Sequence, residues 1–179
     1  MKSNIVLIGM PGASKTTSGR GLSRALSRRF MDTDAIIEYE FSMPVSELIS
    51  TCGEDYFRRQ ETSVIGRLED MENLVVAVGG GAVLSEENRR ILSENAFCIW
   101  LKAKPLTLYD RLFGDANQRP LLGELSIKKI SSTLKKREKF YKEIADAELE
   151  TDALSVERTV EKLKEIVSAL ERAVCPTAF

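Results

Sequence analysis

The segment GMPGASKTT, residues 9–17, nearly matches the phosphate-binding pattern G-x-x-x-x-G-K-[ST]. In such a loop, the backbone N–H groups and the positive end of the following helix attract phosphate groups. Lys15 would then reach the β- and γ-phosphates of a nucleotide, and the Thr16 hydroxyl would ligate Mg²⁺. The pattern departs from the template at Ser14, where a serine costs free energy if the backbone needs unusual dihedral angles. The alternative is a simple turn in which Lys15 is only a surface residue.

Two carboxylates, Asp32 and Asp34, follow a short apolar stretch. One could hold the hydration shell of a metal while the other accepts a proton from a hydroxyl nucleophile. The chain has no histidine, so a general base must be a carboxylate, a lysine or a rarer group. The same absence excludes Ser-His and Cys-His nucleophile pairs and histidine metal sites. The alternative is structural, with Thr33 or Asp34 capping a helix over the segment AIIEYEF.

Three successive glycines, Gly79, Gly80 and Gly81, directly follow the apolar stretch LVVAV. Each glycine loses much conformational freedom on folding, so three in a row need a reason. They favour a place where a ligand approaches the backbone closely, or where several N–H groups converge on an anion. A tight turn is the alternative, although one or two glycines usually suffice for that.

Three arginines are candidates for binding anions. Arg58 and Glu61 are three residues apart on an expected helix, so the carboxylate could fix the guanidinium for bidentate capture of another carboxylate. Arg119 lies in the glycine-flanked segment 114–124, where a cation on a mobile lid could close over a transferring phosphate. Arg137 stands among several lysines, and a solvated helix face is the simpler interpretation for it.

The elements that must position these residues alternate along the chain. Uniformly apolar strands between helices indicate an α/β fold, with a parallel sheet covered by helices on both faces. Ligands bind such sheets at the carboxyl ends of the strands, which is where the glycine-rich turns fall. We expect strands at 4–8, 29–32, 74–78, 96–101 and 147–151. We expect helices at 15–29, 44–50, 54–70, 85–95, 105–113, 126–143 and 155–174.

The composition narrows the class of protein. With 179 residues, the chain fits one domain, and its net charge of −1 gives no reason to expect nucleic acid or an anionic membrane as a partner. No stretch has the length of a signal-peptide core or a membrane span. The cysteines are three and far apart, so a disulfide framework is not expected, and Cys98 in AFCIWL is interpreted as a buried thiol. We expect a cytoplasmic monomer.

The chain resembles the shikimate kinase family, which are small P-loop kinases of aromatic amino-acid biosynthesis, over nearly its whole length. The segments that carry the resemblance occur in the family's order and spacing: GMPGASKTT, FMDTDAIIE, GEDYFRRQE, VAVGGGAVLSEENRRIL, NQRPLL and REKFYKEIADAELETD. The resemblance implies a three-layer P-loop kinase fold with a five-stranded parallel sheet and a mobile lid. It implies Mg²⁺-dependent transfer of the γ-phosphoryl group of ATP to the 3-hydroxyl of shikimate.

The resemblance also implies a role for each site residue. Catalysis would rest on Lys15, Asp34 and Arg119. ATP would be bound by Gly12, Ala13, Ser14, Lys15, Thr16, Thr17, Arg111 and Arg119, with Arg111 beside the adenine. Mg²⁺ would be supported by Thr16 and Asp32. Shikimate would be bound by Asp34, Arg58, Gly79, Gly80, Gly81 and Arg137, with Glu61 orienting Arg58. The kinase domain would span 1–174, with a substrate-binding segment at 34–60, the lid at 114–124 and a tail at 175–179.

Two departures from the family pattern leave alternatives open. Ser14 replaces the loop glycine, and Lys139 stands where a proline is common. The first departure touches the phosphate site, so a weakly active or inactive nucleotide-binding paralogue is one alternative. A gluconate-type kinase is another, although a neutral polyol would not call for the glycine turn and paired arginines.

Overall fold

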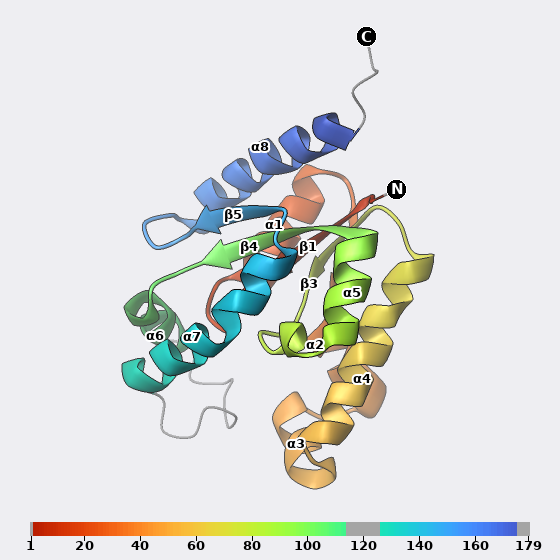
Figure 1. Cartoon of the computed structure of the whole chain (residues 1–179), viewed down its shortest axis with the longest axis vertical. Helices are drawn as coiled ribbons and strands as arrows, with labels where there is room; N and C mark the ends of the chain where they lie inside the picture. Colours follow the sequence, from red (N-terminus) through yellow and green to blue (C-terminus); the bar gives the residue numbers. More distant parts are fainter. Residues whose placement is uncertain (1, 114–125, 175–179) are drawn as a thin grey trace.

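One parallel sheet forms the centre of the protein (Figure 1). The computed structural model describes residues 2–113 and 126–174. The strands lie in the order β2-β3-β1-β4-β5, and every pair of neighbours is parallel. The strand bounds are β1 (Asn4–Ile8), β2 (Arg29–Asp32), β3 (Leu74–Ala77), β4 (Ala96–Lys102) and β5 (Ala147–Glu150). The expected five-stranded parallel sheet is therefore confirmed.

Helices cover both faces of this sheet, as expected (Figure 1). Helices α1 and α8 pack together on one face, while α5 and α7 lie on the other. The α-helices are α1 (Lys15–Ala25), α2 (Thr33–Phe41), α3 (Val45–Cys52), α4 (Glu54–Gly66), α5 (Glu86–Asn95), α6 (Pro105–Phe113), α7 (Ile127–Ile144) and α8 (Val156–Val174). Two short 3₁₀ helices complete the described elements, η1 (Arg67–Asp70) and η2 (Ala82–Leu84).

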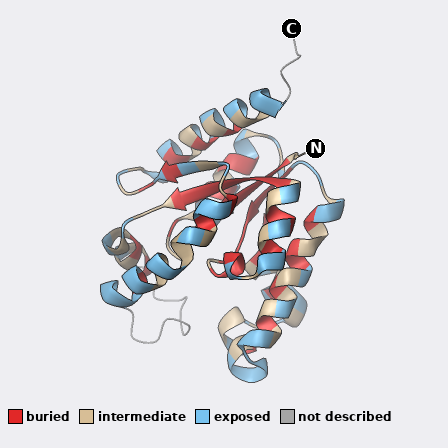
Figure 2. Cartoon of the chain, in the orientation of Figure 1, coloured by how far each residue is buried: buried red, intermediate tan, exposed pale blue. Residues whose placement is uncertain are grey.

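The apolar core follows the central strands. Every residue of β1 and β3 is buried, because helices cover both faces of these strands (Figure 2). The helices, in contrast, bury one stripe and expose the other. Cys98 of β4 is buried, and burial raises the pKa of its thiol to about 12. The buried-thiol interpretation of Cys98 is confirmed.

Two helix ends differ from the sequence expectations. Helix α1 stops at Ala25 rather than residue 29, because Ser27 adopts the left-handed conformation with φ 54°. The N–H of Arg28 then bonds back to the carbonyl of Ser23 at 2.9 Å, which closes the helix end in the manner of a left-handed cap. Helix α4 ends at Gly66 and continues only as the 3₁₀ helix η1.

Some expectations concern residues outside the described ranges. The lid at 114–124, its Arg119 and the tail at 175–179 lie outside the described residues. Within the described ranges, no helix is both long and apolar enough to cross a membrane. The domain bounds, the monomeric state and the cytoplasmic location stay predictions.

Candidate active site

The phosphate-binding loop connects the end of β1 to the start of α1. Its backbone turns through positive φ angles at Gly9 (144°), Gly12 (82°) and Ser14 (64°). The N–H of Ala13 bonds to the carbonyl of Met10 at 3.1 Å, which closes the loop on itself. The loop therefore wraps around the N-terminal end of α1, where the helix dipole attracts anions.

Ser14 lies in the strained part of this loop. Its φ and ψ of 64° and 25° are those of the left-handed region, and its side chain makes no capping hydrogen bond to α1. The unusual dihedral angles considered at this position are therefore present. A non-glycine residue costs roughly 1–2 kcal/mol in this conformation. Ser14 therefore adopts the left-handed backbone of this loop, and the strain lowers the stability of the folded protein by that amount.

Lys15 and Thr16 begin α1 and extend in different directions. The Lys15 ammonium donates to the carbonyls of Gly9 at 2.9 Å and Met10 at 3.0 Å, so it lies against the loop. The Thr16 hydroxyl donates to Oδ2 of Asp32 at 2.7 Å, which connects the loop to the end of β2. The interpretation of Lys15 as a plain surface residue is wrong, since the loop itself binds the ammonium.

Asp32 also caps helix α2. Its Oδ1 accepts the backbone N–H groups of Asp34 at 3.1 Å and Ala35 at 3.2 Å. The sequence alternative had Thr33 or Asp34 as the cap, and both assignments are wrong. Thr33 is fully buried, and its hydroxyl instead accepts the N–H of Gly79 at 3.2 Å. The cap leaves the side chain of Asp34 available for another task.

The Thr16 and Asp32 oxygens fit a hard divalent cation. Because the Thr16 hydroxyl gives its proton to Asp32, its lone pairs remain available as metal ligands. Hydroxyl and carboxylate oxygens are the donors that Mg²⁺ prefers, and Mg²⁺ is usually completed by water and substrate phosphates. Across residues 2–113 and 126–174, no group of three or more acidic or cysteine side chains could hold a metal alone. Such a cation would therefore depend on the phosphates as well.

Asp34 is half-buried at the start of α2, and Oδ1 is the buried atom of its carboxyl group. Its Oδ1 has no hydrogen-bond partner among the described residues. Burial raises the pKa of Asp34 to about 7, and the nearby Glu61 carboxylate adds to the rise. The Lys15 ammonium partly opposes it. A carboxyl with a pKa near neutral can accept a proton at physiological pH, which suits a general base.

Arg58 and Glu61 form the pair that their spacing predicts. Nη1 of Arg58 donates to Oε2 of Glu61 at 2.8 Å, and Nη2 donates to Glu54 at 2.9 Å. The Glu61 side chain is 1% exposed, and burial raises its pKa although Arg58 opposes the rise. The guanidinium is thus oriented by carboxylates from two sides.

The glycine turn Gly79–Gly81 approaches these side chains closely. A Cβ on residue 79 would lie 2.6 Å from Oε1 of Glu61 and 2.8 Å from Oδ1 of Asp34. Both are buried oxygens without a hydrogen-bond partner in the described part of the chain. The absence of a side chain at Gly79 therefore allows the carboxyl groups of Glu61 and Asp34 to lie next to the turn.

Gly80 and Gly81 make room for neighbours on two other sides. A Cβ on Gly80 would lie 2.5 Å from Cδ of Pro11 in the phosphate-binding loop. A Cβ on Gly81 would lie 2.7 Å from Nη2 of Arg58. The close approach expected at this turn is present, and the protein's own groups require it. The turn joins the phosphate loop to the arginine site.

Arg137 reaches the same turn from helix α7. Its Nη1 donates to the carbonyl of Gly80 at 3.0 Å, and the side chain is half-buried. The solvated-face interpretation is therefore wrong for this arginine. Tyr141, one turn further along α7, donates its hydroxyl to the same carbonyl at 2.6 Å.

One predicted site arginine, Arg111, does not join this cluster. The Arg111 guanidinium donates to the hydroxyl of Thr151 at 3.1 Å and to its carbonyl at 2.6 Å, which connects α6 to the segment after β5. Its place beside the adenine stays a prediction. Arg119 lies outside the described residues.

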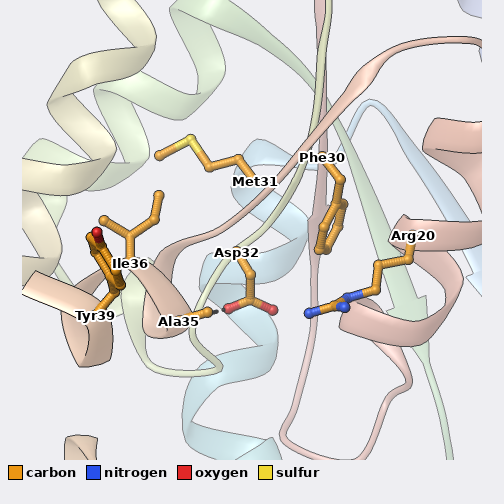
Figure 3. Close-up of a pocket in the computed structure, with 7 residues that line it drawn as sticks. All are labelled: Arg20, Phe30, Met31, Asp32, Ala35, Ile36 and Tyr39. Carbon is orange, nitrogen blue, oxygen red and sulfur yellow. Dashed lines mark hydrogen bonds between the residues drawn. The ribbon is translucent and has the colours of Figure 1, made fainter. Parts of the chain in front are cut away.

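A separate cavity of about 300 Å³ lies on the outer side of Asp32 (Figure 3). The Asp32 carboxylate points into it, toward the guanidinium of Arg20, which stacks over the Phe30 ring at 5.5 Å. Met31, Ala35, Ile36 and Tyr39 complete the lining. Asp32 is the only predicted site residue in this lining, so the cavity adjoins the candidate site without containing it.

Sequence reasoning missed three residues that shape the site. Pro11 packs on Gly80, Thr33 binds the Gly79 N–H, and Tyr141 binds the Gly80 carbonyl. Both Pro11 and Thr33 lie inside motifs, where Pro11 was given no role and Thr33 was considered only as a helix cap. Tyr141 is a landmark of the REKFY segment, and a tyrosine four residues after Arg137 on one helix face was the available signal.

The parallel sheet, the loop after its central strand and the lysine–threonine start of α1 define a P-loop kinase that acts on a small molecule. A sequence model of the family described as shikimate kinase matches residues 11–168. The chain belongs to the shikimate kinase family. The activity that follows is ATP-dependent phosphorylation of a hydroxyl of shikimate.

Individual relatives agree with this assignment. A shikimate kinase of Symbiobacterium thermophilum is 40% identical over 164 residues, covering 90% of this chain and 94% of the relative. The solved shikimate kinase of Acinetobacter baumannii, in complex with shikimate, is 33% identical with a TM-score of 0.88, covering 94% of each chain. A gluconokinase of Sinorhizobium meliloti shares the fold at 16% identity, with a TM-score of 0.65 over 98% of each chain. The gluconate-type alternative is therefore not favoured.

Proposed function

We propose that the described cluster transfers the γ-phosphoryl group of ATP to the 3-hydroxyl of shikimate with the help of Mg²⁺. One observation carries the proposal. Asp34, the Arg58–Glu61 pair and Arg137 all meet at the glycine turn, and this turn packs against Pro11 of the phosphate loop. The glycine turn is thus in contact both with the residues proposed to bind the phosphoryl acceptor and with the loop proposed to bind the phosphoryl donor.

The donor half would be built mainly from backbone. The N–H groups of residues 12–17 and the N-terminal end of α1 would hold the phosphates. The Lys15 ammonium would shift from the loop carbonyls to the β- and γ-phosphates, whose negative charge attracts it more strongly. Arg111 and Arg119 are assigned to the nucleotide by the family resemblance alone.

The cation site would use Thr16 as a ligand and Asp32 as its support. Mg²⁺ neutralises phosphate charge when it is bound. Asp32 contributes by two independent contacts, since one oxygen accepts from Thr16 and the other caps α2. The position of the carboxylate is therefore fixed before any cation binds.

The acceptor half would recognise an anion and a hydroxyl. Shikimate carries a carboxylate, which Arg58 and Arg137 would bind as paired cations. Asp34 would accept a hydrogen bond from the 3-hydroxyl and take its proton as the phosphoryl group arrives. Most of the rate enhancement would come from alignment and charge neutralisation, as is general for phosphoryl transfer.

Ser14 supports a second candidate, a weakly active nucleotide-binding paralogue. Its left-handed backbone places strain inside the phosphate loop. The contacts of Lys15 with the loop carbonyls and of Thr16 with Asp32 nevertheless support an active kinase. We therefore favour an active kinase.

The test is a coupled ADP-release assay with purified protein, ATP and either shikimate or gluconate, with Mg²⁺ or with excess EDTA. We expect strong turnover with shikimate and Mg²⁺, none with EDTA, and little with gluconate. Absence of turnover with either acceptor in a folded protein that still binds ATP would support the inactive paralogue instead. Shikimate turnover that persists in EDTA would contradict the assigned cation.

A further inference from the structure

The carbonyl of Gly80 accepts hydrogen bonds from two side chains of different character. Tyr141 donates its hydroxyl at 2.6 Å, and Arg137 donates Nη1 at 3.0 Å. Both donors come from α7, which packs beside the 3₁₀ helix that follows the turn. A single partly buried carbonyl thus accepts from two side chains, one for each of its lone pairs.

Tyr141 is the fixed donor of the two. Its side chain is fully buried, and its ring stacks on Trp100 of β4 with centroids 5.4 Å apart and an interplanar angle of 26°. Burial raises the pKa of the Tyr141 hydroxyl to about 12, although the neighbouring Arg137 guanidinium opposes the rise, so the group stays protonated and remains a donor. The sheet therefore determines where this hydroxyl points.

Arg137 is the movable donor. Its side chain is half-buried, and no carboxylate among the described residues pairs with it at salt-bridge distance. It is also one of the two arginines, with Arg58, that the proposed function assigns to the substrate carboxylate. A guanidinium that leaves Gly80 for a carboxylate deprives the carbonyl of one hydrogen bond.

We propose that Tyr141 is a positioning residue that keeps the Gly80 carbonyl hydrogen-bonded while Arg137 exchanges this carbonyl for the substrate carboxylate. The inference rests on the proposed role of Arg137. Gly80 is partly buried and its carbonyl lies against the fully buried Tyr141 side chain. An acceptor shielded in this way is costly to leave without a donor, whereas loss of one donor out of two costs little. Tyr141 therefore lowers the cost of releasing Arg137, and it does so without touching substrate.

The exchange predicts a specific coupling between the two residues. In the Tyr141→Phe variant, the Gly80 carbonyl accepts from Arg137 when no substrate is bound. It has no donor once Arg137 moves to the substrate carboxylate. Shikimate affinity should therefore fall about tenfold. In an Arg137→Met background, the carbonyl environment is the same with and without shikimate, so the same tyrosine change should no longer affect affinity.

The experiment is a double-mutant cycle on shikimate binding, measured by titration calorimetry without nucleotide. The proteins are wild type, Tyr141→Phe, Arg137→Met and the double variant, each checked by circular dichroism and thermal melting. Steady-state kinetics of Tyr141→Phe should show a raised shikimate KM with nearly unchanged kcat and ATP KM. A general packing defect would instead weaken binding equally in both backgrounds, and that result would overturn the proposal.

Two further comparisons keep the outcomes distinct. If Arg137→Met alone leaves shikimate affinity unchanged, the proposed function of Arg137 is wrong. If Arg137→Met weakens binding and Tyr141→Phe does not, only the exchange is wrong, because Arg137 then holds both partners at once.

Two more variants serve as control and reserve. Tyr109→Phe removes the hydroxyl of a tyrosine of α6 that does not bond to the Gly80 carbonyl, and this variant should match wild type. Trp100→Phe loosens the ring stack without deleting the donor. Trp100→Phe should weaken shikimate binding less than Tyr141→Phe does, and only when Arg137 is present. If Trp100→Phe weakens binding equally in the Arg137→Met background, the exchange is contradicted. This comparison remains usable if Tyr141→Phe does not fold.

Discussion

Glycine serves the phosphate loop and the glycine turn for physical reasons that overlap only in part. Both regions leave no room for a Cβ, as at Gly9, where it would lie 2.5 Å from the Leu101 carbonyl oxygen, but only the loop also requires positive φ angles. In the loop, Gly12 has φ 82°, a conformation that disfavours any side chain. Among the described residues, the positive φ angles do not include Gly79, Gly80 or Gly81. The turn glycines are needed because a Cβ would strike Glu61, Pro11 or Arg58.

This difference explains why a serine occurs in one region. Ser14 takes a left-handed backbone with φ 64° at a cost of roughly 1–2 kcal/mol, which a domain can absorb. A Cβ in the turn would instead displace the groups that form the acceptor site. Dihedral strain is a local and bounded cost, whereas a steric clash changes the geometry of a site.

The largest effect should come from removing the proposed base. Asp34→Asn keeps the side-chain shape but cannot accept the proton, so kcat should fall about 10²- to 10⁴-fold. ATP affinity should change far less than kcat, because the backbone of the phosphate loop holds most of the phosphate charge. Steady-state kinetics and nucleotide titration measure both quantities. Asp70→Asn, an exposed aspartate of η1, is the matched control; a kcat for Asp34→Asn within threefold of wild type excludes the base role.

The same carboxyl should make folding stability depend on pH. The pKa of Asp34 is about 7 in the folded protein and 3.8 as its ordinary value, so the folded state binds the proton more tightly. Its contribution is fully present below pH 4 and is lost as pH rises toward 7 and above. Without nucleotide or metal, the free energy of unfolding should fall by on the order of 3 kcal/mol from this group.

Denaturant melts of wild type and Asp34→Asn across pH 4–8, in the presence of EDTA, isolate this contribution. The difference between the two proteins should change steadily over the window, with the variant gaining relative stability as pH rises. If the stability curves of the two proteins run parallel over this pH range, the pKa of Asp34 is the same in the folded and the unfolded protein.

A side chain in the turn should have an intermediate effect. Gly80→Ala places a Cβ 2.5 Å from Cδ and 3.0 Å from the backbone nitrogen of Pro11. We expect a loss of about 1–3 kcal/mol in stability and a raised shikimate KM. Gly66→Ala is the control, because a Cβ there meets no atom within 4 Å. Equal melting temperatures and KM values for the two variants would show that the loop and turn can separate freely.

The smallest effect should come from relieving the loop strain. Ser14→Gly removes the left-handed penalty, and the more flexible unfolded chain offsets part of the gain, which leaves about 1 kcal/mol or less. ATP affinity or kcat should rise. Ser27→Gly is a matched control, since Ser27 has φ 54° outside the site. It should give a similar stability change with unaltered kinetics; identical kinetics for Ser14→Gly and wild type would show that the loop tolerates serine.

Local patterns in the sequence predicted much of this architecture. Apolar strands between helices give a covered parallel sheet, and the spacing of Arg58 and Glu61 places them on one helix face. The end of α1 was missed because four residues after Ala25 continue a helical pattern, and only the backbone of Ser27 breaks it.

The site was harder to predict where contacts join distant segments or where several residues compete for one role. In the Asp32–Thr33–Asp34 segment, all three side chains can cap a helix, and tertiary contacts to Thr16 and Gly79 decide among them. The Tyr141–Gly80 hydrogen bond spans 61 residues. Arg137 looked like part of a lysine-rich surface, because composition does not reveal which face of α7 meets the turn.

The stack between Trp100 and Tyr141 has an optical consequence. The chain contains one tryptophan, and its indole lies 5.4 Å from the phenol that holds the glycine turn. All intrinsic indole emission therefore originates next to the tyrosine that binds the glycine turn, between the two proposed substrate sites. The protein carries its own fluorophore there, so the arrival of substrate can be followed in real time without attaching a dye.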